Sequence, residues 1–184
     1  MRWLSRSPER WISRSPEDTR EAARGLARAL RGRGLVIALV GPLGAGKTAF
    51  VQGLAEGLGI GPAPVASPTF VLASEYAAPG GLRLAHVDLY RIESAAELDA
   101  AGFRDLLAPE VVLAVEWADR FPEALPADRL ELRIARAPGD PGTQREILAV
   151  GLGSAANRVL ARWSAGRGPS GSRGRHRARG ASER

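Results

Sequence analysis

Eight consecutive residues, Gly41 to Thr48 (GPLGAGKT), have the types and spacing that bind phosphate groups. The run opens with a glycine and closes with glycine, lysine and threonine, which is the spacing of a phosphate-binding loop. The backbone N–H groups of such a loop surround phosphate oxygens, and the following helix adds the positive end of its dipole. The sequence therefore predicts a nucleotide site built from Gly41, Pro42, Leu43, Gly44, Ala45, Gly46, Lys47 and Thr48.

Lys47 is the only lysine in the chain, although 26 residues are lysine or arginine. Arginine is planar and wider than a lysine ammonium, so it is a poor substitute for a cation that must fit beside phosphates. A glycine-rich turn that matches the loop by chance is the alternative. Against it, an apolar run of strand length (35–40) precedes the loop and a helical pattern (49–58) follows it, which is the arrangement expected around a phosphate-binding loop.

Asp88 and Glu116 are acidic residues at the predicted ends of two strands. Ligands of open α/β sheets bind at the carboxyl ends of the strands. A nucleoside triphosphate there brings Mg²⁺, which takes one ligand from the threonine hydroxyl of the loop, here Thr48, and support from a nearby carboxylate. We expect one of the two acids to give that support, the alternative being a surface carboxylate that caps a loop. His86 shares a strand face with Asp88, and taken alone it indicates a structural histidine rather than a ligand.

Two further side chains each have two interpretations. Trp117 either fills the edge of the core or anchors a nucleotide or a partner surface. Thr69 follows a proline in a predicted loop, where its hydroxyl either stabilises a turn or senses the terminal phosphate of a nucleotide. Residue type alone leaves both pairs of alternatives open.

Strands and helices alternate along the chain. Apolar runs of strand length are bounded by glycine, proline and polar residues, and Ser94 with Glu97 forms a capping box that opens a helix. The predicted strands are 35–40, 71–76, 82–87, 111–115, 129–135 and 145–150, and a final helix spans 154–163. This order predicts an α/β fold with a P-loop NTPase-like layered sheet, mostly parallel with an antiparallel pair at one edge.

We expect one domain with an extension at each end. Residues 2–9 (RWLSRSPE) and 10–17 (RWISRSPE) form a tandem repeat, and only the second copy leads into a helix, with Ser15 as its N-cap and Pro16 as its first residue. The predicted organisation is a disordered extension at 1–9, a nucleotide-binding domain at 10–163 and a disordered tail rich in arginine, glycine and serine at 164–184.

The net charge of +6 is concentrated in the tail. Residues 164–184 hold six arginines and one glutamate, which leaves the rest of the chain nearly neutral. The tail either touches RNA electrostatically or is a solvated, arginine-rich end, and we favour the second interpretation. No apolar run reaches the ~18 residues of a membrane span, no apolar signal core follows Met1, and cysteine is absent. We therefore expect a cytoplasmic protein that does not bind membranes.

Several classes of nucleotide protein contain such a loop. A GTPase is disfavoured, because the Asn-Lys-x-Asp motif that recognises guanine needs a second lysine, and because Arg91 stands where a glycine would follow Asp88. A small-molecule kinase and a non-catalytic ATP-gated adaptor stay open beside an ATPase.

The motifs in combination resemble the TsaE (YjeE) family, the bacterial ATPases of tRNA threonylcarbamoyladenosine synthesis. The resemblance covers residues 10–163 and rests on GPLGAGKT (41–48), SPTF (67–70), HVDLYR (86–91) and VEW (115–117), in that order. The loop alone is shared by many families, whereas the combination is specific.

The resemblance implies a P-loop ATPase domain with a mixed sheet, and an ATPase that is slow alone and stimulated by partner proteins. Its implied partners are TsaD and TsaB, with tRNA contacted indirectly through their complex, which modifies the adenosine next to the anticodon. ATP and Mg²⁺ are the implied cofactors. For individual residues, it implies that Lys47 holds phosphates, that Thr48 and Glu116 serve Mg²⁺, that Asp88 and Thr69 lie by the reacting phosphate, and that Trp117 belongs to the nucleotide site.

Overall fold

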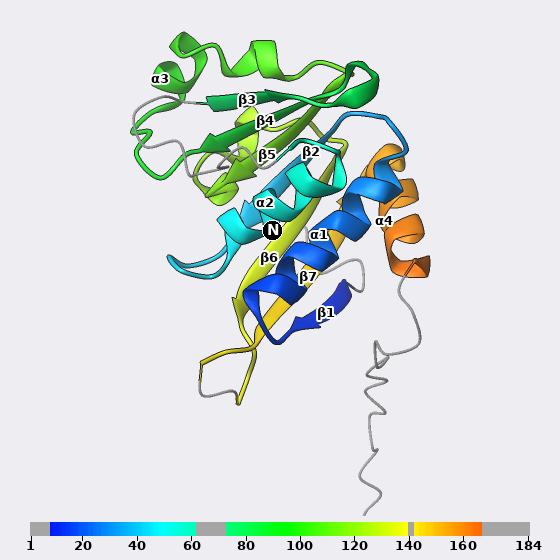
Figure 1. The fold of residues 1–184 in the computed structure, drawn as a ribbon. Helices are drawn as coiled ribbons and strands as arrows, with labels where there is room; N and C mark the ends of the chain where they lie inside the picture. Colours follow the sequence, from blue (N-terminus) through cyan, green and yellow to red (C-terminus); the bar gives the residue numbers. More distant parts are fainter. Residues whose placement is uncertain (1–7, 62–72, 140–141, 167–184) are drawn as a thin grey trace, which may run out of the picture.

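The computed structural model describes residues 8–61, 73–139 and 142–166, and Figure 1 shows how its elements are arranged. Seven strands form one sheet in the order β1-β7-β6-β2-β5-β4-β3. The strands are β1 (Glu9–Ser13), β2 (Leu35–Val40), β3 (Ala73–Ala77), β4 (Arg83–Asp88), β5 (Val111–Glu116), β6 (Arg129–Arg136) and β7 (Arg145–Leu152). The α-helices are α1 (Pro16–Leu30), α2 (Lys47–Gly57), α3 (Ala95–Ala100) and α4 (Ser154–Ala165).

The sheet is mixed rather than mostly parallel, which corrects the prediction. Strands β4, β5, β2 and β6 run parallel in its centre. At one edge β3 pairs antiparallel with β4, and at the other β7 pairs antiparallel with both β6 and β1. A parallel crossover needs about a dozen residues or more. The connections 78–82 and 137–144 are too short for one, so β3 with β4 and β6 with β7 pair antiparallel. Both edges are therefore antiparallel, where the sequence indicated only one.

Alternate residues of the central strands face two separate apolar cores. In β2, Ile37 and Leu39 pack in the core that α1, α2 and α4 share, whereas Val36 and Ala38 pack in the core on the α3 side. The helices α1, α2 and α4 therefore cover one face of the sheet and α3 covers the other (Figure 1). Because β2 is buried on both faces, its sequence is apolar throughout, and its predicted bounds are confirmed.

The second copy of the repeat forms a strand before it caps a helix. Residues 10–13 of this copy, together with Glu9 before them, form β1, which pairs with β7. Trp11 stacks on Trp163 of α4 with ring centroids 3.9 Å apart. The predicted N-cap of α1 is confirmed, because the Ser15 side chain accepts a hydrogen bond from the backbone N–H of Asp18. This copy thus joins the sheet to two helices, a role that its sequence did not indicate.

The predicted extensions fall mostly outside the described residues, which begin at Pro8 and end at Gly166. Within the described part, Glu9 already belongs to β1 and α4 extends to Ala165. In that part of the chain, no helix has the length and apolar character needed to cross a membrane.

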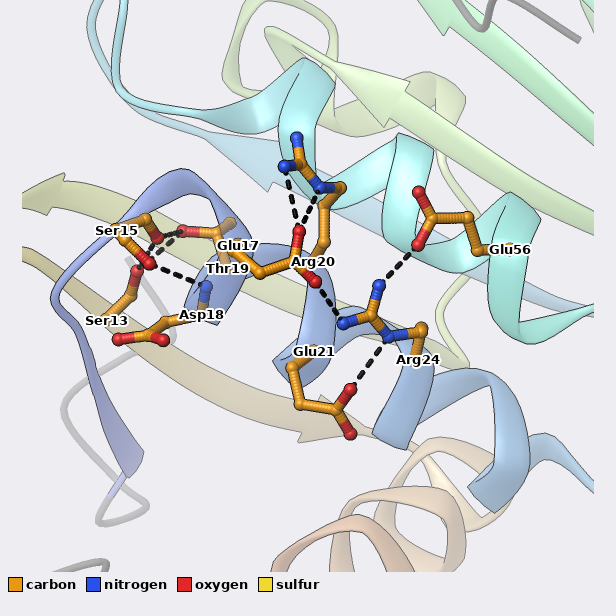
Figure 2. A network of polar contacts seen from close by, with 9 residues as sticks. All are labelled: Ser13, Ser15, Glu17, Asp18, Thr19, Arg20, Glu21, Arg24 and Glu56. Carbon is orange, nitrogen blue, oxygen red and sulfur yellow. Dashed lines mark hydrogen bonds and ion pairs between the residues drawn. The ribbon is translucent and has the colours of Figure 1, made fainter. Parts of the chain in front are cut away.

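A network of ion pairs joins α1 to α2, as Figure 2 shows. Arg24 of α1 donates to Glu17 and Glu21 on its own helix and to Glu56 of α2. The Arg24 guanidinium holds the pKa of Glu17 below its ordinary value of 4.5, and Arg20 adds to the effect. Arg24 is likewise the main cause of the lowered pKa of Glu21. The network therefore links α1 to α2, the helix that follows the glycine-rich loop.

Candidate functional site

The glycine-rich loop joins the central strand β2 to α2, which begins at Lys47. Gly41 lies so close to β6 that a Cβ atom there would stand 2.1 Å from the backbone oxygen of Ile134. Gly46, the N-cap of α2, has a φ of 103°, a left-handed conformation that disfavours side chains. The path of the loop therefore requires these two glycines, and the predicted order of strand, loop and helix is confirmed.

Within the described residues, the N-terminus of α2 carries no side-chain cap and no acidic residue in its first turn. The other helices differ. Ser15 caps α1 and Ser94 caps α3, while the Asp128 carboxylate accepts hydrogen bonds from the N–H groups of Ala155 and Ala156 at the start of α4. The first N–H groups of a helix have no partner within the helix and attract anions. The start of α2 is therefore suited to an anionic ligand.

Lys47 is folded over its own loop. Its Nζ donates to the backbone oxygens of Gly41 and Pro42 at 2.8 and 3.0 Å and lies 4.0 Å from the centroid of the Trp117 ring. Lys47 is only 4% exposed. Burial lowers the pKa of its ammonium group, while nearby carboxylates, Glu116 first among them, act in the opposite direction. The loop thus holds a buried cation whose hydrogen-bond partners are carbonyl groups.

Thr48, in the first turn of α2, reaches Glu116 at the end of β5. Its hydroxyl donates to Oε1 of Glu116 at 2.8 Å, and the same oxygen lies 2.9 Å from Nε2 of His86 in β4. Glu116 is 3% exposed and His86 is fully buried. The structure thus brings together the two residues that the sequence assigned to Mg²⁺ and adds a third.

Asp88 ends β4 directly beside Glu116, its partner in the parallel ladder between β4 and β5. Its Oδ1 accepts a hydrogen bond from the backbone N–H of Tyr90 at 2.9 Å, so the turn after β4 holds the carboxylate in place. The backbone N–H of Leu89 donates to the backbone oxygen of Glu116 at 3.1 Å, which ties the two strand ends together. Both acids therefore lie at the carboxyl edge of the parallel strands, where the loop also begins.

Trp117 follows β5 in a left-handed conformation with a φ of 57°, which residues with a side chain rarely adopt. Its ring centroid lies 5.0 Å from that of Tyr90, and its other contacts include Lys47 and the core on the α3 side. Trp117 therefore packs at the edge of the core and also contacts the lysine of the loop, and its role toward a nucleotide or a partner stays a prediction. Strained backbone of this kind is concentrated at functional sites.

The structure brings five of the predicted site residues together at one edge of the sheet: Lys47, Thr48, Asp88, Glu116 and Trp117. Thr69 lies outside the described residues. His86, which the sequence indicated as structural, contacts Glu116 directly, and its position two residues before Asp88 on the same strand face was the signal for that contact. Tyr90 was not singled out from the sequence, and only its place in the HVDLYR segment pointed to it.

A cavity of about 700 Å³ lies elsewhere, lined by residues of β1, α1 and α4 that include Trp11, Arg28, Arg162 and Trp163. No residue of the loop 41–48 lines it. We place the candidate site at the loop, because the buried lysine, the uncapped helix and the two carboxylates converge there.

This combination defines an α/β protein with a glycine-rich loop between its central strand and an uncapped helix, beside two acids at neighbouring strand ends. The chain belongs to the TsaE family, because the family model "Threonylcarbamoyl adenosine biosynthesis protein TsaE" matches residues 13–147. The resemblance inferred from the motifs is thereby confirmed.

Two relatives carry the description "tRNA threonylcarbamoyladenosine biosynthesis protein TsaE". That of Streptomyces coelicolor is 44% identical over 136 residues, which are 73% of this chain and 90% of the relative. That of Bacillus subtilis is 41% identical over 154 residues, which are 84% of this chain and 87% of the relative. The crystal structure of YdiB from Bacillus subtilis has a TM-score of 0.66 and 36% identity, and the match covers 88% of this chain and 98% of YdiB.

Proposed function

We propose that this protein binds ATP with Mg²⁺ at the loop 41–48 and hydrolyses the ATP to ADP and phosphate, in support of tRNA threonylcarbamoyladenosine synthesis. The proposal is carried by one arrangement, the hydrogen bond between Thr48 and Glu116 beside the buried Lys47. The start of α2 supports it, because within the described residues no side chain caps it, and its N–H groups face the place where the phosphates of the nucleotide would lie.

The donor set is compatible with Mg²⁺. The described part of the chain has no group of three or more histidine, cysteine or acidic residues that could hold a metal ion. Mg²⁺ does not need one, because it keeps several waters and is commonly bound through one or two protein ligands together with substrate phosphates. Thr48 and Glu116 supply a hydroxyl and a carboxylate, and oxygen is the ligand atom that Mg²⁺ prefers. Bound there, Mg²⁺ would neutralise part of the negative charge of the phosphate groups.

Each residue of the site then has a role. Lys47 would exchange the carbonyls of its loop for phosphate oxygens, and Thr48 and Glu116 would hold Mg²⁺. Asp88 orients the attacking water at the terminal phosphate. The Trp117 ring holds the ammonium of Lys47 at the loop by a cation–π contact and separates the site from the core on the α3 side.

The names of the relatives support the pathway, since both are described as proteins of tRNA threonylcarbamoyladenosine biosynthesis. In this proposal the chain acts in the cytoplasm with TsaD and TsaB and meets tRNA only through that complex. Leu43 at the tip of the loop is 83% exposed and Tyr90 beside Trp117 is 52% exposed. Large apolar side chains exposed around a site are suited to a partner protein that covers them.

The test is ATP hydrolysis by the purified chain, alone and with the TsaB–TsaD pair added. We expect slow hydrolysis alone and clear stimulation by the pair, because a site covered by a partner excludes water and completes its contacts. Rapid turnover alone, with phosphate transferred to a small metabolite, would instead identify a kinase. Nucleotide binding with no hydrolysis in either setting would identify an ATP-gated adaptor.

A further inference from the structure

His86 is a fully buried polar residue whose hydrogen-bond partner is an acid of the site. The ring is 0% exposed, and its Nε2 lies 2.9 Å from Oε1 of Glu116. Among the described residues its Nδ1 is buried and has no hydrogen-bond partner. A histidine that only filled space would leave both nitrogens without partners, at a cost that an apolar side chain avoids. The contact of Nε2 with Glu116 therefore gives this position a reason to be polar.

The contact constrains the Glu116 carboxylate. The Thr48 hydroxyl donates to Oε1 at 2.8 Å, and Nε2 of His86 approaches the same atom from the neighbouring strand. An ionised carboxylate has only acceptor sites, so toward it the Thr48 hydroxyl and the Nε2–H tautomer of His86 both act as donors. Because both bonds go to Oε1, they fix the rotation of the carboxylate, and no residue in the described part of the chain bonds to Oε2.

The sheet holds His86 rigidly in this position. His86 pairs with Ala114 in the parallel ladder of β4 and β5, two residues before the pair of Asp88 with Glu116. Strand residues two apart share a face, so His86 and Glu116 both lie on the face that α2 covers, as Leu84 and Ala114 do. A donor on a central strand is better fixed than one on a loop, because the ladder leaves its backbone no freedom.

We propose that His86 is a positioning residue that orients the Glu116 carboxylate toward Thr48 and thereby sets how strongly nucleotide binding depends on Mg²⁺. The inference rests on the proposed function, because it needs a Mg²⁺–nucleotide site at Thr48 and Glu116. His86 itself touches neither the metal nor the phosphates. Residues that orient a metal ligand typically change metal affinity by about 10–100-fold when they are replaced.

Two polar substitutions separate positioning from packing. In His86→Gln the side-chain amide nitrogen takes the place of Nε2, so the donor to Glu116 is retained. In His86→Asn the amide reaches only the place of Nδ1, so the donor is lost although the residue stays polar. His86→Phe removes both nitrogens and keeps the ring, which provides a second donor-free variant. Leu84→Ala is the control for packing, because Leu84 is fully buried on the same strand and the same face.

The measurement is the affinity for a fluorescent ATP analogue, in EDTA and across a Mg²⁺ titration, with the melting temperature of each variant. We expect affinities in EDTA close to that of the wild type for all variants, because the loop and Lys47 are intact. The Mg²⁺ concentration at half effect should rise about tenfold or more in His86→Asn and His86→Phe and stay near the wild-type value in His86→Gln. Leu84→Ala should lower the melting temperature without moving the Mg²⁺ midpoint.

Three outcomes overturn the inference. A wild-type Mg²⁺ midpoint in His86→Asn or His86→Phe would show that the donor is not needed. A midpoint that moves in step with the melting temperature, in Leu84→Ala as in the His86 variants, would show a purely structural role. If the wild-type chain binds the analogue with no response to Mg²⁺, both the proposed function and the inference fail. This failure is seen in the wild type, whereas the first two outcomes are seen only in the variants.

Discussion

Thr48 and Glu116 lie 68 positions apart in the sequence, and Oγ1 of the first lies 2.8 Å from Oε1 of the second. Thr48 is held by the first turn of α2, and Glu116 is the last residue of β5. Because the Thr48 hydroxyl donates its hydrogen bond to the carboxylate, the lone pairs of its oxygen can accept from or coordinate another partner. The contact thus joins the helix layer to the sheet at the proposed metal site.

Glu116→Gln tests this pair directly. The substitution keeps the shape of the side chain and removes its charge, so we expect the Mg²⁺-dependent part of nucleotide binding to weaken by about 1.5–3 kcal/mol, the range of a charge-assisted contact. Titration of a fluorescent ATP analogue with and without Mg²⁺ measures it. Glu110→Gln, an exposed acid just before the start of β5, is the matched control and should bind like the wild type. Wild-type Mg²⁺ dependence in Glu116→Gln would show that the metal site lies elsewhere.

Asp88→Asn should separate hydrolysis from binding. We expect nucleotide affinity to be largely retained and partner-stimulated hydrolysis to slow by roughly a hundredfold or more, because a positioned acid–base or electrostatic group is lost. The assay is phosphate release at saturating ATP. Asp99→Asn on α3, where the carboxylate pairs with Arg104, serves as the control. If Asp88→Asn instead loses the Mg²⁺ dependence of binding at unchanged turnover, the roles of the two acids are exchanged.

Lys47→Met should abolish nucleotide binding and change how stability depends on pH. Burial lowers the pKa of Lys47 from its ordinary value of 10.5. Between the folded pKa and 10.5 the unfolded chain binds more protons than the folded chain, so the Lys47 contribution to the free energy of unfolding rises with pH in that window. Urea unfolding from pH 7 to pH values near 10.5 should therefore show that the free energy of unfolding of the wild type rises relative to that of Lys47→Met. Parallel curves for the two proteins would contradict the burial of a charged Lys47.

Arg24→Gln should make the protein less stable at neutral pH but not in acid. Glu17 and Glu21 have pKa values lowered from 4.5, chiefly by Arg24. A lowered carboxyl pKa stabilises the fold above the unfolded value of 4.5, and this contribution is lost as the pH falls through the folded pKa. We expect a melting temperature below that of the wild type at neutral pH and low salt, with a difference that narrows below pH 4.5.

The control for this prediction is Arg104→Gln, which removes an exposed pair with Asp99 on a short helix. An exposed pair of this kind contributes little, so its melting curve should follow the wild type at both pH values. A difference between Arg24→Gln and the wild type that is as large at pH 3 as at pH 7 would mean that Arg24 stabilises α1 and α2 by packing rather than by charge.

Local rules were enough for several features of the protein. Both ends of β2 could be predicted to the exact residue, because a strand buried on both faces is apolar along its whole length. The loop and the start of α2 followed from glycine spacing, and Ser15 with Pro16 marked the start of α1, since each of these depends on the backbone of a few neighbouring residues. Asp88 and Glu116 were predicted as candidates because each directly follows an apolar strand.

The tertiary structure alone decided which distant residues meet. The sequence did not indicate β1, because a five-residue edge strand is stabilised by its pairing with β7 and by the stacking of Trp11 on Trp163, not by its own pattern. The two antiparallel edges likewise depend on strand neighbours. The contact of His86 with Glu116 required the pairing of β4 with β5. The sequence alone indicated a structural histidine, and this contact makes His86 a neighbour of the candidate site. Sequence pattern carries the periodicity of one element, whereas a hydrogen bond between two elements depends on their order and register in the sheet.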